Sequence, residues 1–120
     1  MVTGPLDFYS FTIPVNYASG NSKTLSYSNR PIGHYLILWQ SESSIGDNST
    51  ILSMLSSVTN ATINLNPPFR GIMDSGGGHT GFGFIQTNST NFTITLYAWG
   101  YYPSSYSQTF RVVLIYLGPI

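Results

Sequence analysis

The feature that most restricts the fold of this chain is a series of short segments rich in strand-forming residues, each ending at Gly, Pro, Asn or Ser. Ser, Thr and Asn supply 17, 12 and 9 of the 120 residues, whereas the helix-favouring residues Ala, Glu and Lys are scarce. Thr, Tyr, Phe, Val and Ile fit the pleated surface of a strand, and Ser, Asn and Gly favour turns. The pattern predicts an all-β protein.

Eight segments are expected to form strands, at a spacing of about ten residues. They are Tyr9–Val15, Leu25–Tyr27, His34–Gln40, Ala61–Leu65, Phe69–Met73, Thr80–Thr87, Asn91–Tyr101 and Thr109–Leu117. This spacing is typical of a sandwich or a closed barrel. Because no linker divides the chain, we expect one domain over residues 1–120, a single jelly-roll β-sandwich of about eight antiparallel strands.

One segment departs from the strand pattern. In Ser49–Val58 the apolar residues follow helical spacing better than alternation, and Asp47 or Asn48 could cap a first helical turn. The apolar residues concerned are Ile51, Leu52, Met54, Leu55 and Val58. The segment is therefore predicted to be a short helix inserted between strands.

The most apolar segments are expected to supply the core between the two sheets. The predicted core residues are Leu36, Leu38, Phe92, Ile94, Val113 and Ile115. Gly81 and Gly83 alternate with Phe82 and Phe84, and a glycine inside a strand indicates a bulge or a close approach of another group to the backbone.

Charged residues make up only 7% of the chain, with four basic and four acidic side chains and a net charge of zero. Nucleic acid is excluded as a main partner, because such binding needs several Lys and Arg side chains to neutralise phosphates. Without cysteine, the chain has no disulfide and no thiolate metal site. Its longest apolar runs, Tyr35–Trp39 and Val112–Leu117, are far shorter than the roughly 18 residues of a membrane span, and Met1–Pro5 lacks a signal-peptide pattern.

The candidates for catalysis are few, so the chain is not expected to be an enzyme. His34, His79 and Asp74 have the residue types of a two-histidine, one-carboxylate metal site, but no close histidine spacing ties them together. No G-x-S-x-G motif marks a nucleophilic serine, and only four carboxylates are present. The loop around Gly76–Gly78 lacks the lysine of a phosphate-binding loop. We therefore predict no catalytic residue, no metal and no cofactor.

An aromatic group is the clearest candidate for binding. Trp99, Tyr101, Tyr102 and Tyr106 gather around the turn expected between the last two strands. Aromatic side chains beside Ser and Gln are common in protein interfaces and in sugar-binding sites, and they also cover the ends of sandwiches. All three interpretations stay open from the sequence.

Four Asn-x-Ser/Thr sequences make Asn48, Asn60, Asn88 and Asn91 candidates for N-glycosylation. Three of the four fall in predicted turns, where a glycan can attach. The scarcity of titratable groups predicts that the protein tolerates acid, because stability changes with pH only through groups whose proton affinity differs between the folded and unfolded states. A protein that works outside the cell, in acidic surroundings, fits both observations.

This cysteine-free composition, rich in Tyr, Ile, Asn, Ser and Thr, together with the segments Asn91–Trp99 and Thr109–Leu117, resembles that of exterior proteins of viruses that infect hot, acid-loving archaea. In style the chain is similar to the jelly-roll vertex and turret proteins of turreted icosahedral viruses. The resemblance covers the whole chain and rests on composition and strand spacing.

The resemblance implies a structural domain of a virion vertex, turret or spike that acts by assembly, with host attachment as a further role. Its partners would be other copies of itself and other virion proteins. Two alternatives remain. One is a carbohydrate-binding adhesin module, whose partner would be a cell-surface glycan. The other is an extracellular archaeal filament subunit, in which a terminal strand completes the sheet of a neighbour.

Overall fold

The computed structural model describes residues 6–15, 19–43, 50–66, 70–73, 78–101 and 106–120. These residues form nine strands. The strands are β1 (Leu6–Val15), β2 (Ser19–Tyr27), β3 (Gly33–Ser43), β4 (Thr50–Thr59), β5 (Thr62–Asn66), β6 (Arg70–Met73), β7 (Gly78–Thr87), β8 (Phe92–Tyr101) and β9 (Tyr106–Gly118). Within the described ranges, no helix has the length and the apolar character needed to cross a membrane.

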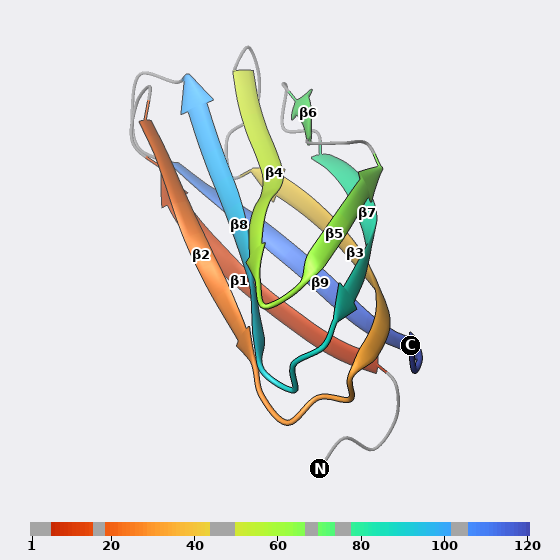
Figure 1. Cartoon of the computed structure of the whole chain (residues 1–120). Coiled ribbons are helices and arrows are strands. Elements are labelled where there is room, and N and C mark those ends of the chain that lie inside the picture. The colour runs from red at the N-terminus through yellow and green to blue at the C-terminus, as the bar shows by residue number, and fades with distance from the viewer. Residues whose placement is uncertain (1–5, 16–18, 44–49, 67–69, 74–77, 102–105) are drawn as a thin grey trace.

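The strands form two antiparallel sheets that pack face to face (Figure 1). One sheet has the order β1-β9-β3-β7-β5 and the other the order β2-β8-β4-β6. With β5 left out, the remaining eight strands are ordered 1-8-3-6 and 2-7-4-5, which is the jelly-roll arrangement. The predicted fold class is therefore confirmed. β5 is an additional strand, paired with β7 at the edge of the five-stranded sheet.

The core lies between the sheets and comes from one face of each strand. In β8 the alternation is regular: Phe92, Ile94, Leu96 and Ala98 are each at most 1% exposed. Across from them, β3 and β9 contribute six buried apolar side chains, which are Tyr35, Ile37, Trp39, Phe110, Val112 and Leu114. The prediction for Phe92 and Ile94 is confirmed.

The prediction for the other four core residues is wrong. Leu36, Leu38, Val113 and Ile115 lie on the outer face of the five-stranded sheet, where Leu38 is 39% exposed and the other three are half-buried. β3 and β9 are apolar on both faces, so their sequence has no alternation that distinguishes inside from outside. A shift of one residue moves every side chain of a strand to the other face.

The predicted helix at Ser49–Val58 is also wrong, because residues 50–59 form β4. β4 pairs with β8 and carries a bulge between Leu55 and Ser57. The extra residue at the bulge puts Leu55 and Val58 opposite Leu96 and Ile94, so both face the core although they are three positions apart. A bulged strand therefore reproduces the three-residue spacing of a helix.

Gly81 makes the close approach that its place in a strand indicates. It pairs with Trp39, and a Cβ atom at position 81 would lie 2.6 Å from Cζ2 of the indole ring. The missing side chain makes room for the largest ring of the core.

Candidate interaction surfaces

The outer face of the five-stranded sheet carries a continuous group of apolar side chains, which we call the outer apolar patch. It consists of Phe8 on β1, Val113 and Ile115 on β9, Leu36 and Leu38 on β3, and Phe82 and Phe84 on β7. Phe8 is 61% and Phe84 54% exposed, so these two rings alone present on the order of 200 Å² of apolar surface. With the other five side chains the patch reaches the size that usually marks an interaction site.

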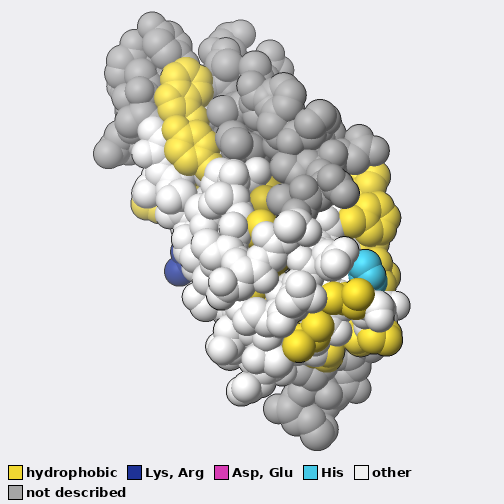
Figure 2. Space-filling model, viewed as in Figure 1, with side chains coloured by type: hydrophobic (Ala, Val, Ile, Leu, Met, Phe, Trp, Pro, Cys, Tyr) yellow, Lys and Arg dark blue, Asp and Glu magenta, His cyan; other side chains and the backbone are white. Residues whose placement is uncertain are grey.

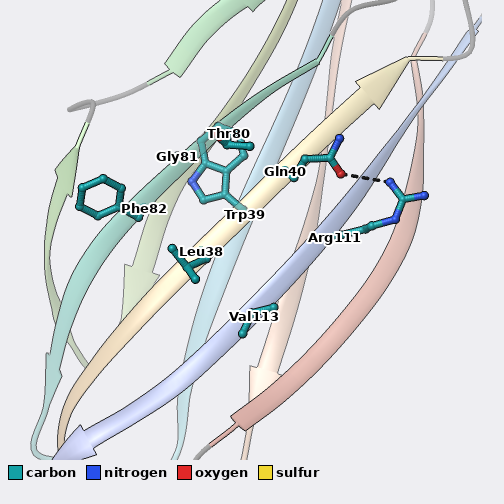
Figure 3. Close-up of a pocket in the computed structure, with 8 residues that line it drawn as sticks. All are labelled: Leu38, Trp39, Gln40, Thr80, Gly81, Phe82, Arg111 and Val113. Atoms are coloured by element: carbon teal, nitrogen blue, oxygen red, sulfur yellow. Dashed lines mark hydrogen bonds between the residues drawn. The ribbon is translucent and has the colours of Figure 1, made fainter.

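The patch ends at a polar row that completes the same face. Nη1 of Arg111 donates hydrogen bonds to Oε1 of Gln40 at 3.1 Å and to Oε1 of Glu42 at 2.9 Å. A shallow groove of about 400 Å³ runs from this polar row onto the patch. Figure 3 shows that its lining side chains come from three neighbouring strands, with Leu38 and Val113 beside the hydrogen-bonded pair.

The outer face of the four-stranded sheet has the opposite character. Hydroxyl groups pair across its strands: Thr24 with Thr95 at 2.9 Å between the Oγ1 atoms, and Thr59 with Thr93. Figure 2 views this side of the molecule, and most of its described surface is neither apolar nor charged. Hydroxyl groups form hydrogen bonds with water, so covering this face with a partner stabilises much less than covering the outer apolar patch does.

A second groove, of about 390 Å³, lies where β1 of one sheet meets β2 of the other. Arg30 closes one end of it by a bidentate ion pair with Asp7, with N–O distances of 2.9 and 3.1 Å. Tyr9 (47% exposed) and Lys23 line the groove, and Lys23 has no ion-pair partner among the described residues. Burial, with a smaller contribution from the Asp7 charge, raises the pKa of Tyr27 in this groove to about 12.

Three candidate glycosylation sites lie at one end of the sandwich, the lower end in Figure 1. Asn60 follows β4, and Asn88 and Asn91 belong to the turn between β7 and β8. The Asn60 side-chain amide donates to the carbonyl of Asn91 at 3.2 Å, and Oδ1 of Asn91 accepts a hydrogen bond from the amide of Asn29. Asn88, Asn60 and Asn91 are all exposed, as the predicted sites require. Asn48 lies outside the described residues.

The predicted aromatic group is only partly described. Trp99 and Tyr101 belong to β8 and Tyr106 to β9, so the group joins the two sheets rather than closing a hairpin within one of them. The Trp99 side chain is half-buried on the outer face of the four-stranded sheet. Tyr102 and the side chains of Tyr101 and Tyr106 lie outside the described residues, so the three interpretations of this group stay open.

The histidines considered as metal ligands are not brought together. His34 pairs with Gln86 and His79 pairs with Ser41, so the two residues sit at opposite ends of the β3–β7 ladder, roughly 23 Å apart along the strands. Among the described residues, no group of three or more His, Asp or Glu side chains could hold a metal ion. Asp74 lies outside those residues.

Sequence reasoning missed the outer apolar patch because it assigned four of the seven patch residues to the core. A signal was present in β7, where Phe82 and Phe84 alternate with Gly81 and Gly83. The glycines face the bulky ring of Trp39 and the buried interior, which leaves the phenylalanines on the outside. Large apolar side chains that alternate with glycine on a central strand therefore indicate an apolar outer face.

The fold defines the class of protein as a jelly-roll β-sandwich. No protein-family model matches the chain, and no curated protein matches it. Among solved structures it is similar to one described as the globular domain of zebrafish complement 1qA protein, with 10% sequence identity and a TM-score of 0.35. That alignment covers 79% of this chain and 70% of the other. A similarity of this extent carries no information on function.

Proposed function

We propose that this protein is a non-enzymatic structural subunit of a virion, which acts outside the cell by assembling through the outer face of its five-stranded sheet. The observation that carries the proposal is the outer apolar patch. The core between the sheets is complete without it, since residues such as Ile37, Leu96 and Leu114 are fully buried in the single chain. The patch is additional apolar surface, and covering it is favourable at about 25 cal/mol per Å².

The contrast between the two outer faces supports assembly with a defined orientation. A subunit that packs into a shell or a spike needs one face toward its partners and another toward water. The hydroxyl-rich face of the four-stranded sheet suits water, and the apolar face suits a protein partner. The jelly-roll fold and the composition agree with a vertex or turret protein of an archaeal virus, but both are shared with other proteins.

Immunogold electron microscopy tests the proposal directly. An antiserum raised against the purified chain is applied to whole cultures of the source organism, cells and released particles together. We expect label on particles, concentrated at their vertices or spikes. Label on cell walls would contradict the virion assignment and favour an adhesin, and label along filaments would contradict it and favour a filament subunit.

One observation favours a second candidate function, the binding of a glycan. The groove between β1 and β2 combines an exposed tyrosine ring with two basic side chains, Lys23 and Arg30. A sugar stacks on such a ring, and its hydroxyl or carboxylate groups accept hydrogen bonds from the cations. A glycan array tests this candidate with the intact chain and with Tyr9→Ala and Trp99→Ala as separate variants. Binding lost only in Tyr9→Ala would place the sugar in this groove.

A further inference from the structure

The side chains of the outer face lie in rows that run across the strands. The register aligns Phe8, Val113, Leu38 and Phe82 in one row. The next row contains Ile115, Leu36 and Phe84, so two neighbouring rows are apolar. On the other side of the first row lies a polar row of Ser10, Arg111, Gln40 and Thr80. Within each row the named side chains are therefore either all apolar or all polar.

This arrangement is nearly symmetric about a line that runs along the strands between β9 and β3. The line exchanges β9 with β3 and β1 with β7. Under this exchange Val113 corresponds to Leu38, Phe8 to Phe82 and Ile115 to Leu36. In each of these three pairs an apolar residue corresponds to another apolar residue in the same row.

We propose that a second copy of this chain covers the outer apolar patch, related by a two-fold axis that runs along the strands between β3 and β9. The inference rests on the proposed assembly function and names its first partner. Around this axis Leu38 of one protomer faces Val113 of the other, and apolar rows cover apolar rows. Facing sheets pack about 10 Å apart, with their strands within about 30° of each other.

The charges on the face select a second copy as the occupant. Arg111 and Glu42 sit side by side on neighbouring strands at the polar end of the patch, with 45% and 48% of their side chains exposed. A partner with charge of one sign would repel one of the two groups. A second copy related by the proposed axis instead brings its own Gln40 over Arg111, and its own Glu42 lies one row further along, within reach of the long Arg111 side chain. The arrangement is complementary to itself, as a two-fold interface requires.

The size of the face also agrees with a stable dimer. Four strands of 10 to 13 residues and the five-residue β5, spaced about 4.8 Å apart with about 3.3 Å per residue, present a face of roughly 700–800 Å². A specific protein–protein interface of standard size takes about 800 Å² from each partner. Covering the face once is therefore enough for a defined dimer.

Sedimentation-equilibrium measurements across the micromolar range test whether the chain dimerises. We expect the mass of a dimer for the intact chain and the mass of a monomer for Leu38→Glu. The dissociation constant should rise at least about 100-fold, because the interface would bury two unpaired carboxylates. Ser22→Glu is the matched control: it adds the same charge to an exposed site on β2 of the other sheet and should leave the dimer intact. Thermal unfolding checks that each variant folds.

Charge reversal then tests the axis itself. Arg111→Glu and Glu42→Arg are each expected to be monomeric, since each would place like charges within reach of each other twice. Mixed together, the two variants should form a heterodimer. In that heterodimer the introduced glutamate of one chain lies within reach of the introduced arginine of the other, and the two unchanged partners, Glu42 and Arg111, also lie within reach of each other. If the pair acts only within one chain, mixing restores nothing.

Each result decides something. A monomeric intact chain, or a Leu38→Glu variant that dimerises like the intact chain, would overturn the proposed dimer. A trimer or a larger ring would overturn the two-fold axis, as would charge-reversal variants that stay monomeric after mixing. None of these results depends on whether particles carry the protein, so failure of the dimer and failure of the virion assignment are distinguishable.

Discussion

Two neighbouring residues of β3 allow a sharp test of which face of the strand is buried. Ile37 is fully buried between the sheets, and Leu38, the next residue, lies on the outer face. Replacing Ile37 with Ala removes three buried carbon atoms and leaves a cavity in a closely packed core. Substitutions of this kind cost about 2–5 kcal/mol. For a domain of this size that loss lowers the melting temperature by at least about 8 °C.

Replacing Leu38 with Ala should cost much less in the monomer. The side chain is already 39% exposed, so only part of its transfer free energy is lost, and water fills the space that it leaves. Fully burying a leucine is worth about 1.5–3 kcal/mol, so the partly covered Leu38 contributes at most about 1–2 kcal/mol. The two substitutions remove similar volumes from adjacent positions, so each serves as the control for the other.

Urea unfolding of both variants at low protein concentration, followed by circular dichroism, measures the two losses. We expect the Ile37→Ala loss to exceed the Leu38→Ala loss by at least about 1 kcal/mol. Equal losses, or a larger loss for Leu38→Ala, would refute the assignment of the two faces. If the proposed dimer forms, the Leu38→Ala loss should grow with protein concentration, whereas the Ile37→Ala loss should change little.

Three further predictions concern alkali, acid and packing. Burial raises the pKa of both Tyr35 and Tyr27 to about 12. The neutral rings therefore stabilise the fold at pH values below 10, and that contribution is lost as the pH rises toward 12. Calorimetry between pH 8 and 12 should show a falling melting temperature, and the fall should be smaller in Tyr35→Phe. Between pH 7 and pH 3 the melting temperature should fall by only a few degrees, because few groups titrate. A drop of about twenty degrees would contradict this, because it would show that a carboxylate such as Asp7 contributes far more to the stability of the fold than one partly exposed ion pair can. Gly81→Ala should cost about 1–3 kcal/mol in urea unfolding, because the new methyl group collides with the Trp39 ring, and a change near zero would show that the ring moves aside freely.

Most of the strands could be predicted from local sequence because strand-forming runs and turn residues act over short distances. β8 shows this best: Phe92, Ile94, Leu96 and Ala98 alternate along it and are all buried, and the prediction of Phe92 and Ile94 as core residues is confirmed. β4 shows the limit. Its bulge depends on pairing with β8, a partner some forty positions away, and no local pattern distinguishes a bulged strand from a short helix.

By itself the sequence determined the fold class, since its composition favours strands over most of the chain and its turn spacing fits two stacked sheets. From the small number of titratable groups the sequence also predicts that no residue is catalytic, and that stays a prediction. Only the tertiary structure decided which face of β3 and β9 points outward. A strand that is apolar on both faces has no preferred orientation of its own, and its register is set by pairing with β1 and β7 and by the fit of Trp39 over Gly81. That choice turned Leu38 and Val113 from core residues into the outer apolar patch.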